Sequence, residues 1–76
     1  MNTTHLQGIG SVPSKAVREL DPFGGDIILW NYGYKSRVLR TIPSPSGKTF
    51  SVVLQSLGSG KVSTRRLGAE TLVGIA

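Results

Sequence analysis

The sequence predicts an all-β fold, a small barrel of five short strands. Apolar and polar residues alternate with a period of two, most regularly over residues 49–56, where Phe50, Val52 and Leu54 share one face. Clusters of glycine, proline and serine interrupt the chain every few residues and favour turns. Several short strands at this spacing, with almost no helix between them, indicate a small barrel or two orthogonal sheets.

The size and composition limit the kind of protein. A chain of 76 residues makes one domain, and it buries only about 60% of the surface that its unfolded form exposes. We therefore expect no deep enclosed active site. Cysteine is absent, so neither a disulfide nor a thiolate zinc site is expected. The sequence shows no signal-peptide pattern and no apolar run long enough to cross a membrane, which predicts a soluble cytoplasmic protein.

The first 20 residues are expected to form an N-terminal tail or lead-in to the barrel. Residues 1–13 are small, polar and glycine-containing, with too few apolar side chains to order themselves, which predicts a flexible tail. Ser14 can cap a short helical turn over residues 15–20, and an extended lead-in is the alternative for the same segment. The boundary lies near Asp21, and the barrel is expected over residues 21–76.

The barrel is predicted to begin with a turn over residues 21–26, because Pro22 fixes one backbone angle and two glycines permit positive φ. Asp26 is expected to accept hydrogen bonds from amide groups of this turn. The first strand follows over residues 26–32 and is apolar on both faces at its start. Gly33 then permits a sharp turn before the second strand.

The second strand is predicted over residues 35–42. Strict alternation would place one set of side chains, Val38, Arg40 and Ile42, on one face and the other set, Arg37, Leu39 and Thr41, on the opposite face. Arg40 is expected at the rim of the barrel, since an arginine between two core residues would need a buried partner.

The other strands follow from their turns. Two prolines in residues 43–48 remove ladder donors, so this segment is predicted to be a long hairpin tip. The segment after the fourth strand is long enough for one 3₁₀ turn. The predicted order is a strand over 49–56, a turn over 57–60, a strand over 61–67, the 3₁₀ turn within 67–71 and a short closing strand over 72–76.

This order of elements resembles the SH3-like small barrels. Three segments, Gly25 to Leu29, Gly33 to Lys35 and Arg37 to Leu39, are similar to the opening of KOW and Tudor-type barrels, which are associated with nucleic acids. The likeness covers about residues 20–76, although Ser36-Arg37 stands where a KOW element usually has a glycine. The Gly-Asp-Ile-Ile-Leu-Trp-Asn entry and the Arg-Arg-Leu-Gly-Ala segment also resemble small proteins of actinobacterial phages, which implies an origin and no activity.

The chemical motifs predict no enzyme activity, no cofactor and no metal. The only histidine, His5, lies in the expected tail, so a nucleophile would lack a base beside it. The four carboxylates lack calcium-loop spacing. The segment Gly58 to Lys61 resembles part of a phosphate-binding loop, but Val62 stands where that loop has Ser or Thr, and a strand follows instead of a helix. We interpret this segment as a hairpin turn.

The basic and aromatic residues carry the functional prediction. A formal charge of +5 draws the chain toward polyanions. Two exposed aromatics, Tyr32 and Tyr34, are predicted to offer a stacking surface. Because Arg65 and Arg66 are adjacent, they point to opposite faces of a strand, so at most one joins the stripe unless the chain bulges. The predicted phosphate contacts form one basic stripe of Lys35, Arg37, Arg40, Lys61, Arg65 and Arg66, extended by Lys48 at the hairpin tip.

The sequence thus predicts a small protein that binds DNA or RNA without catalysis. Solvated charge, with tyrosines that only cover the edge of a core Trp30, is the structural alternative. The functional alternative is a module for protein interaction or self-assembly, for example a phage protein that binds an acidic host protein or a second copy of itself. A membrane role is disfavoured, because no segment combines an amphipathic helix with a lysine-rich face.

Overall fold

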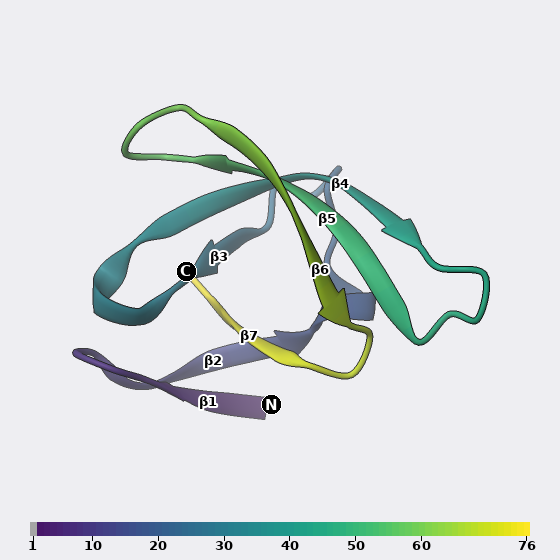
Figure 1. Ribbon diagram of the computed structural model, residues 1–76. Helices are drawn as coiled ribbons and strands as arrows, with labels where there is room; N and C mark the ends of the chain where they lie inside the picture. The colour runs from purple at the N-terminus through teal and green to yellow at the C-terminus, as the bar shows by residue number, and fades with distance from the viewer. Residues whose placement is uncertain (1) are drawn as a thin grey trace.

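The chain folds into one open sheet of seven antiparallel strands, as a computed structural model of residues 2–76 shows (Figure 1). The strand order is β1-β2-β7-β3-β4-β5-β6. Two short 3₁₀ helices, η1 (Val17–Glu19) and η2 (Asn31–Gly33), interrupt it. The strands are β1 (Asn2–Leu6), β2 (Gly10–Ala16), β3 (Ile27–Leu29), β4 (Lys35–Pro43), β5 (Thr49–Ser56), β6 (Val62–Gly68) and β7 (Leu72–Ile75).

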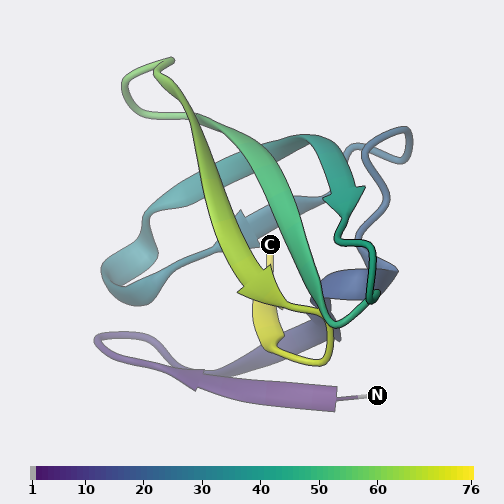
Figure 2. The same cartoon turned by 45° about the vertical axis from the view of Figure 1, so that its right-hand side comes forward.

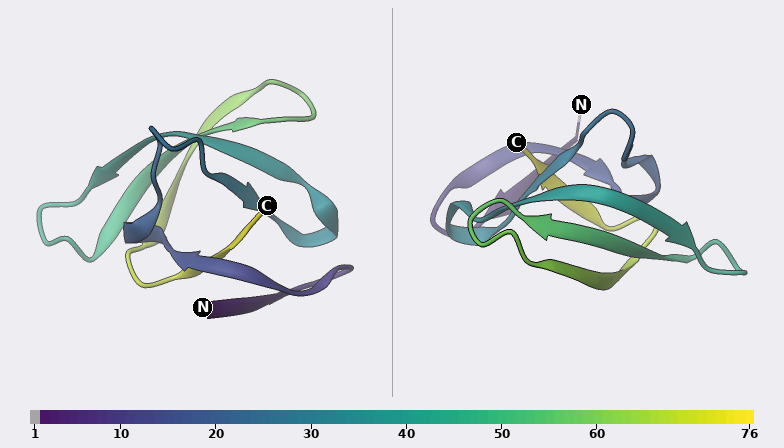
Figure 3. Two further views of the ribbon diagram at one scale, coloured as in Figure 1. Left: turned by 180° about the vertical axis from the view of Figure 1, so that it is seen from behind. Right: turned by 90° about the horizontal axis from the view of Figure 1, so that it is seen from above.

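The all-β class is confirmed, but the structure shows seven strands in one open sheet and not a closed barrel of five. Strands β3 to β6 form a meander, and β7 returns to pair with β3, as a five-stranded fold would require. The sheet then continues past β7 into β2 and β1 and ends at two edges, β1 and β6. Seen from above, the β4–β5–β6 meander lies on one side of the molecule and the β1–β2 hairpin on the other (Figure 3).

The expected flexible tail is also wrong for the residues that the structure describes, which exclude Met1. Residues 2–16 form the β1–β2 hairpin, and β2 pairs with β7 in the register Ser14 to Gly74 (Figure 2). Val12, Ser14 and Ala16 are buried. This segment has too few apolar residues to become ordered by itself. It is ordered here because its backbone donors and acceptors pair with those of an existing sheet.

The segment between β2 and β3 makes the turn that the sequence predicts. The carboxylate of Asp26 accepts a hydrogen bond from the Asp21 amide at 2.8 Å and forms an ion pair with Lys15 Nζ at 3.0 Å. Gly25 has a φ of 76°, the positive value expected there. The short helical turn expected nearby is present as η1, and extended backbone leads into it through Ala16.

The first predicted strand is shorter in the structure, because β3 ends at Leu29 and η2 follows. Tyr32 in η2 has a φ of 63°, which an L side chain rarely adopts. Two hydrogen bonds to Gln7 hold it there: the Tyr32 amide donates to the Gln7 carbonyl at 2.8 Å, and the Tyr32 hydroxyl donates to Gln7 Oε1 at 2.9 Å. The β1–β2 turn therefore fixes the loop between β3 and β4.

Strand β4 carries a β-bulge that the sequence analysis did not anticipate. Val38 pairs with Leu54 and Arg40 with Val53, so Leu39 is an extra residue in the ladder. The alternation shifts by one residue at this point. Val38 therefore faces the core at 1% exposure, whereas Arg40 and Ile42 point to the other side of the sheet and are exposed. The expected grouping of Val38 with Arg40 and Ile42 is wrong for this reason.

The hairpins and turns after β4 agree with the sequence. β5 has the predicted bounds, and its Val52 and Leu54 are buried on one face. Residues 57–60 form the turn to β6. The single 3₁₀-type turn expected within residues 67–71 is present, and an i→i+3 hydrogen bond closes it: the Thr71 amide donates to the Gly68 carbonyl at 3.1 Å.

The core lies on the inner, concave side of the coiled sheet. Ile28, Val17 and Val52 are fully buried at its centre, and Trp30 packs against it while remaining partly exposed. Within residues 2–76, no helix is both long and apolar enough to span a membrane. The buried cluster comprises Val17, Leu20, Ile28, Val38, Val52, Leu54 and Val73, with Phe50, Leu67 and Ile75 packed against it.

Candidate functional site

Charge is strongly segregated along this chain. The β4–β5–β6 meander, residues 35–68, contains seven of the nine lysines and arginines and no aspartate or glutamate. It therefore carries +7, and the remaining residues carry −2, which together give the +5 of the whole chain. The seven cations are Lys35, Arg37, Arg40, Lys48, Lys61, Arg65 and Arg66. Such a concentration of one sign raises the local potential and attracts polyanions.

The ion pairs of the described residues leave this cluster of charge uncompensated. Lys15 pairs with Asp26 at 3.0 Å, and Arg18 pairs with Glu70 at 2.7 Å. Both cations lie outside the meander, so within residues 2–76 none of the seven meander cations forms an ion pair. Their side chains are exposed. They remain available to an external anion.

Four of these cations share the convex side of the meander, which we call the outer face and define by Lys35, Arg37, Arg40 and Arg66. The strand register sets their positions: Arg37 lies opposite Gln55, Arg40 opposite Val53 and Arg66 opposite Ser51. Side chains alternate along β5, so these three β5 residues point away from the core that Val52 and Leu54 face. The bulge at Leu39 is what brings Arg40 to the face of Arg37.

The fifth, Arg65, lies on the concave side. It pairs with the buried Val52, and its guanidinium carbon lies 4.8 Å from the centre of the Trp30 ring. Arg65 and Arg66 thus point to opposite faces, as the sequence predicts. Of the other two cations, Lys48 lies in the tip between β4 and β5, and Lys61 lies just before β6, where its carbonyl accepts the Ser56 amide.

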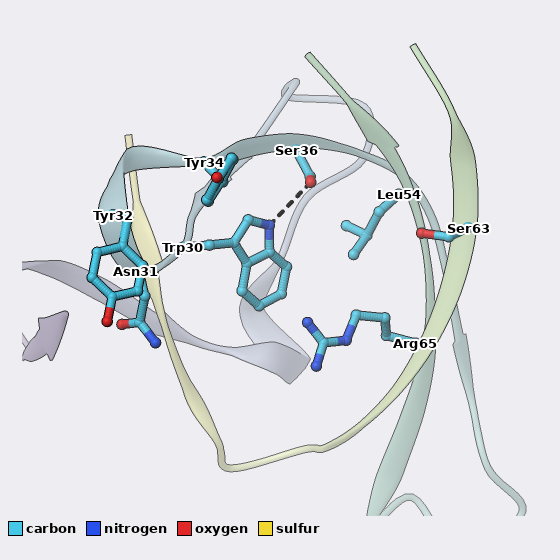
Figure 4. Close-up of a pocket in the computed structure, with 8 residues that line it drawn as sticks. All are labelled: Trp30, Asn31, Tyr32, Tyr34, Ser36, Leu54, Ser63 and Arg65. Carbon is cyan, nitrogen blue, oxygen red and sulfur yellow. Dashed lines mark hydrogen bonds between the residues drawn. The ribbon is translucent and has the colours of Figure 1, made fainter. Parts of the chain in front are cut away.

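Beside Arg65 the concave side has a hollow of about 400 Å³, which we call the aromatic hollow. Figure 4 shows Trp30 in its middle, with the two tyrosines to one side and Arg65 and Leu54 to the other. The tyrosines are largely exposed, Tyr32 at 68% and Tyr34 at 72%. The lining residues are Trp30, Asn31, Tyr32, Tyr34, Ser36, Leu54, Ser63 and Arg65.

Hydrogen bonds fix the aromatic hollow from two directions. Trp30 Nε1 donates to the Ser36 hydroxyl at 3.0 Å, which sets the plane of the indole ring (Figure 4). The Trp30 amide donates to the Tyr34 carbonyl at 2.7 Å, which closes the loop between β3 and β4. On the other side, the Gln7 amide donates to Asn31 Oδ1 at 2.9 Å. The N-terminal hairpin therefore supports one wall of the hollow.

The predicted single stripe is divided by the structure. Lys35, Arg37, Arg40 and Arg66 are on the outer face, whereas Arg65 joins Tyr32 and Tyr34 at the aromatic hollow. Sequence reasoning treated Trp30 as a core residue and missed Asn31, Ser36 and Ser63. The signal for Ser63 was its place in the alternation of β6 with Arg65, which puts both on the side of Leu54.

The described residues contain no cluster of three His, Cys, Asp or Glu side chains that could hold a metal ion. His5 lies exposed on β1 opposite Ser11. No family model, curated protein or solved structure matches the chain.

Proposed function

We propose that this protein binds nucleic acid through the phosphate backbone, with the outer face as its contact surface. The observation that carries the proposal is the charge segregation: residues 35–68 contain seven exposed cations and no carboxylate. On a surface whose charges neutralise one another, cations and carboxylates are mixed, as in the Arg18–Glu70 pair. The meander instead requires an anionic partner or counterions to offset its charge.

The outer face is suited to phosphates more than to base edges. Arg37, Arg40 and Arg66 come from two strands and are spread over a convex sheet, and a guanidinium binds a phosphate with two parallel hydrogen bonds. A convex face has no ridge to enter a groove, so these contacts carry little sequence information. Binding of this kind weakens steeply as salt rises, because condensed counterions are released.

The resemblance described from the sequence agrees with this proposal. The segments from Gly25 to Leu39 that are similar to KOW and Tudor-type openings occupy β3, η2 and the start of β4. The same segments supply Lys35 and Arg37 of the outer face and the loop of the aromatic hollow. An SH3-like core extended by a hairpin would account for the strand order, and it remains part of the proposal.

Titration of labelled single-stranded and double-stranded DNA and RNA at several salt concentrations tests the proposal. We expect binding at low salt, and we expect the logarithm of the affinity to fall linearly with the logarithm of the salt concentration. A matched control is the Arg18→Gln variant, which removes one charge from outside the meander. Failure of every nucleic acid to bind at low salt would refute the proposal.

A protein-interaction or self-assembly role is the second candidate, favoured by the exposed edge of the sheet. Strand β6 ends the strand order, and residues 62–66 are exposed, so its outward backbone groups can pair with another strand. Phe23 is fully exposed at the tip of its turn. Light scattering and a pulldown with an acidic partner protein test this candidate; a strict monomer that retains no protein would count against it.

A further inference from the structure

We propose that the aromatic hollow holds one unstacked nucleobase, so that the protein prefers single-stranded nucleic acid to duplex. This inference rests on the proposed function, and it assigns a separate task to the concave side. The outer face accounts for phosphate binding without the hollow, so the two can be tested apart.

The hollow presents flat surfaces on which a base can stack. Trp30 has a partly exposed indole whose plane is set by the hydrogen bond to Ser36, and the Arg65 guanidinium lies over that ring at 4.8 Å. Tyr34 stands beside them with 72% of its surface exposed (Figure 4). A ring that is already fixed loses little conformational freedom when a ligand stacks on it. Every base has a flat π-face, so such a surface accepts bases of any sequence. The volume of about 400 Å³ lies in the range of small-ligand sites.

The charge of the hollow suits a neutral base better than a cation. Aromatic rings also bind cations, and a nearby carboxylate adds to that attraction. Here the Arg65 guanidinium already lies over Trp30 at 4.8 Å, and no carboxylate lines the hollow. A second cation would be repelled by Arg65. A neutral base attached to a phosphate is attracted by the same group, which also offers a flat surface for stacking.

Part of the lining of the hollow is polar. The hydroxyls of Ser36 and Ser63 and the side-chain amide of Asn31 border the hollow, and all three can donate a hydrogen bond to a base edge. In a duplex these edges are already paired, and flipping a base out costs a few kcal/mol. A single strand avoids this cost, so the hollow discriminates in its favour.

The hollow is continuous with one end of the outer face. Tyr34 at the rim of the hollow is followed directly by Lys35, which begins β4 and shares the outer face with Arg37. The Lys35 carbonyl accepts the Leu57 amide at 3.1 Å, and Lys61 lies at the same end of the sheet through its bond to Ser56. A nucleic-acid strand whose base occupies the hollow can thus pass over Tyr34 and place its phosphates near Lys35 and Lys61.

The experiment uses the full chain and four labelled probes of one length: oligo(dT), oligo(U), an abasic strand with the same number of phosphates, and a duplex. Affinity is measured by anisotropy, and occupation of the hollow by the fluorescence of Trp30, the only tryptophan. We expect at least one base-bearing single strand to bind about fivefold or more tighter than the abasic strand, with quenching of Trp30, and tighter than the duplex.

Two adjacent variants separate the faces. Arg65→Gln should remove most of the advantage over the abasic strand, whereas Arg66→Gln, with the same charge loss on the opposite face, should weaken all probes by a similar factor. Tyr34→Ala, at an exposed position, provides a second variant of the hollow. Equal affinity for abasic and base-bearing strands, or tighter binding of duplex, would overturn the inference and leave the proposed function standing. Failure of all four probes to bind at low salt would overturn both.

Discussion

The guanidinium carbon of Arg65 lies 4.8 Å from the centre of the Trp30 ring, across the concave side of the sheet. Arg65 belongs to the edge strand β6, and Trp30, 35 positions earlier, directly follows β3. Their contact joins the edge strand of the sheet to the indole ring of Trp30. Arg66, the next residue, points to the outer face beside Ser51. One strand thus supplies a cation to each side.

This contact predicts a difference in stability between two neighbouring substitutions. Arg65→Gln should lower the free energy of unfolding by about 0.5–1 kcal/mol, the usual worth of an exposed cation–π contact. Arg66→Gln should change it by less than about 0.5 kcal/mol, as surface substitutions generally do. Urea unfolding followed by Trp30 fluorescence measures both. An equal effect of the two variants would show that the Arg65–Trp30 contact does not stabilise the fold.

The local chemistry of the chain predicted the elements whose signals are local. β5 has its predicted bounds, since Phe50, Val52 and Leu54 alternate without interruption. The turn before β3 also forms as expected, because Asp26 and Gly25 supply a carboxylate and a positive φ. These features depend on a few neighbouring residues, so the sequence contains the information for them.

The elements that were mispredicted depend on partners far away in the sequence. The β1–β2 hairpin is ordered by pairing of Ser14 with Gly74, and no pattern within residues 1–20 reveals that partner. The bulge at Leu39 reflects the register between β4 and β5, and it reversed the expected face of Arg40. For the candidate site, alternation along β6 predicts that Arg65 and Arg66 lie on opposite faces, whereas the face of Arg40 depends on the bulge in β4.

The packing of Gly8 against Tyr32 predicts that the N-terminal hairpin shapes the aromatic hollow. A Cβ at Gly8 would lie 2.7 Å from Tyr32 Cδ1, so Gly8→Ala should displace the tyrosine. Gly60→Ala is the matched control, because Gly60 has nearly the same positive φ, 75° against 78° at Gly8, but a Cβ there would contact nothing within 4 Å. We expect Gly8→Ala to be the more destabilising by about 1–3 kcal/mol.

Thermal unfolding compares the two alanine variants, and the near-ultraviolet circular dichroism of the aromatic residues reports on the hollow. Both variants carry the strain of alanine at positive φ, so only the steric contact with Tyr32 distinguishes them. Equal stability of the two, with unchanged aromatic signals, would show that Tyr32 yields freely to the added methyl group.

The two ion pairs should differ in their contribution to stability. Asp26 has a side chain only 14% exposed and accepts hydrogen bonds from both the Asp21 amide and Lys15. Asp26→Ala removes both hydrogen bonds, one of them to an ammonium group, and should cost about 1–3 kcal/mol. Glu70, with a side chain 78% exposed, pairs with Arg18 at the surface, and Glu70→Ala should cost less than about 1 kcal/mol. Urea titration measures both, and comparable losses would contradict this ranking.

If the outer face binds phosphates, the salt dependence of the affinity should depend on which cation is removed and not only on the net charge. Each of Arg37→Gln, Arg40→Gln and Arg66→Gln should reduce the slope of log affinity against log salt by about one, because each removes one phosphate contact. Arg18→Gln lowers the net charge equally, but Arg18 already pairs with Glu70 at 2.7 Å outside the meander. Its slope should therefore stay close to that of the unmodified protein. If all four variants had the same slope, nucleic acid would respond to the overall charge and not to the outer face.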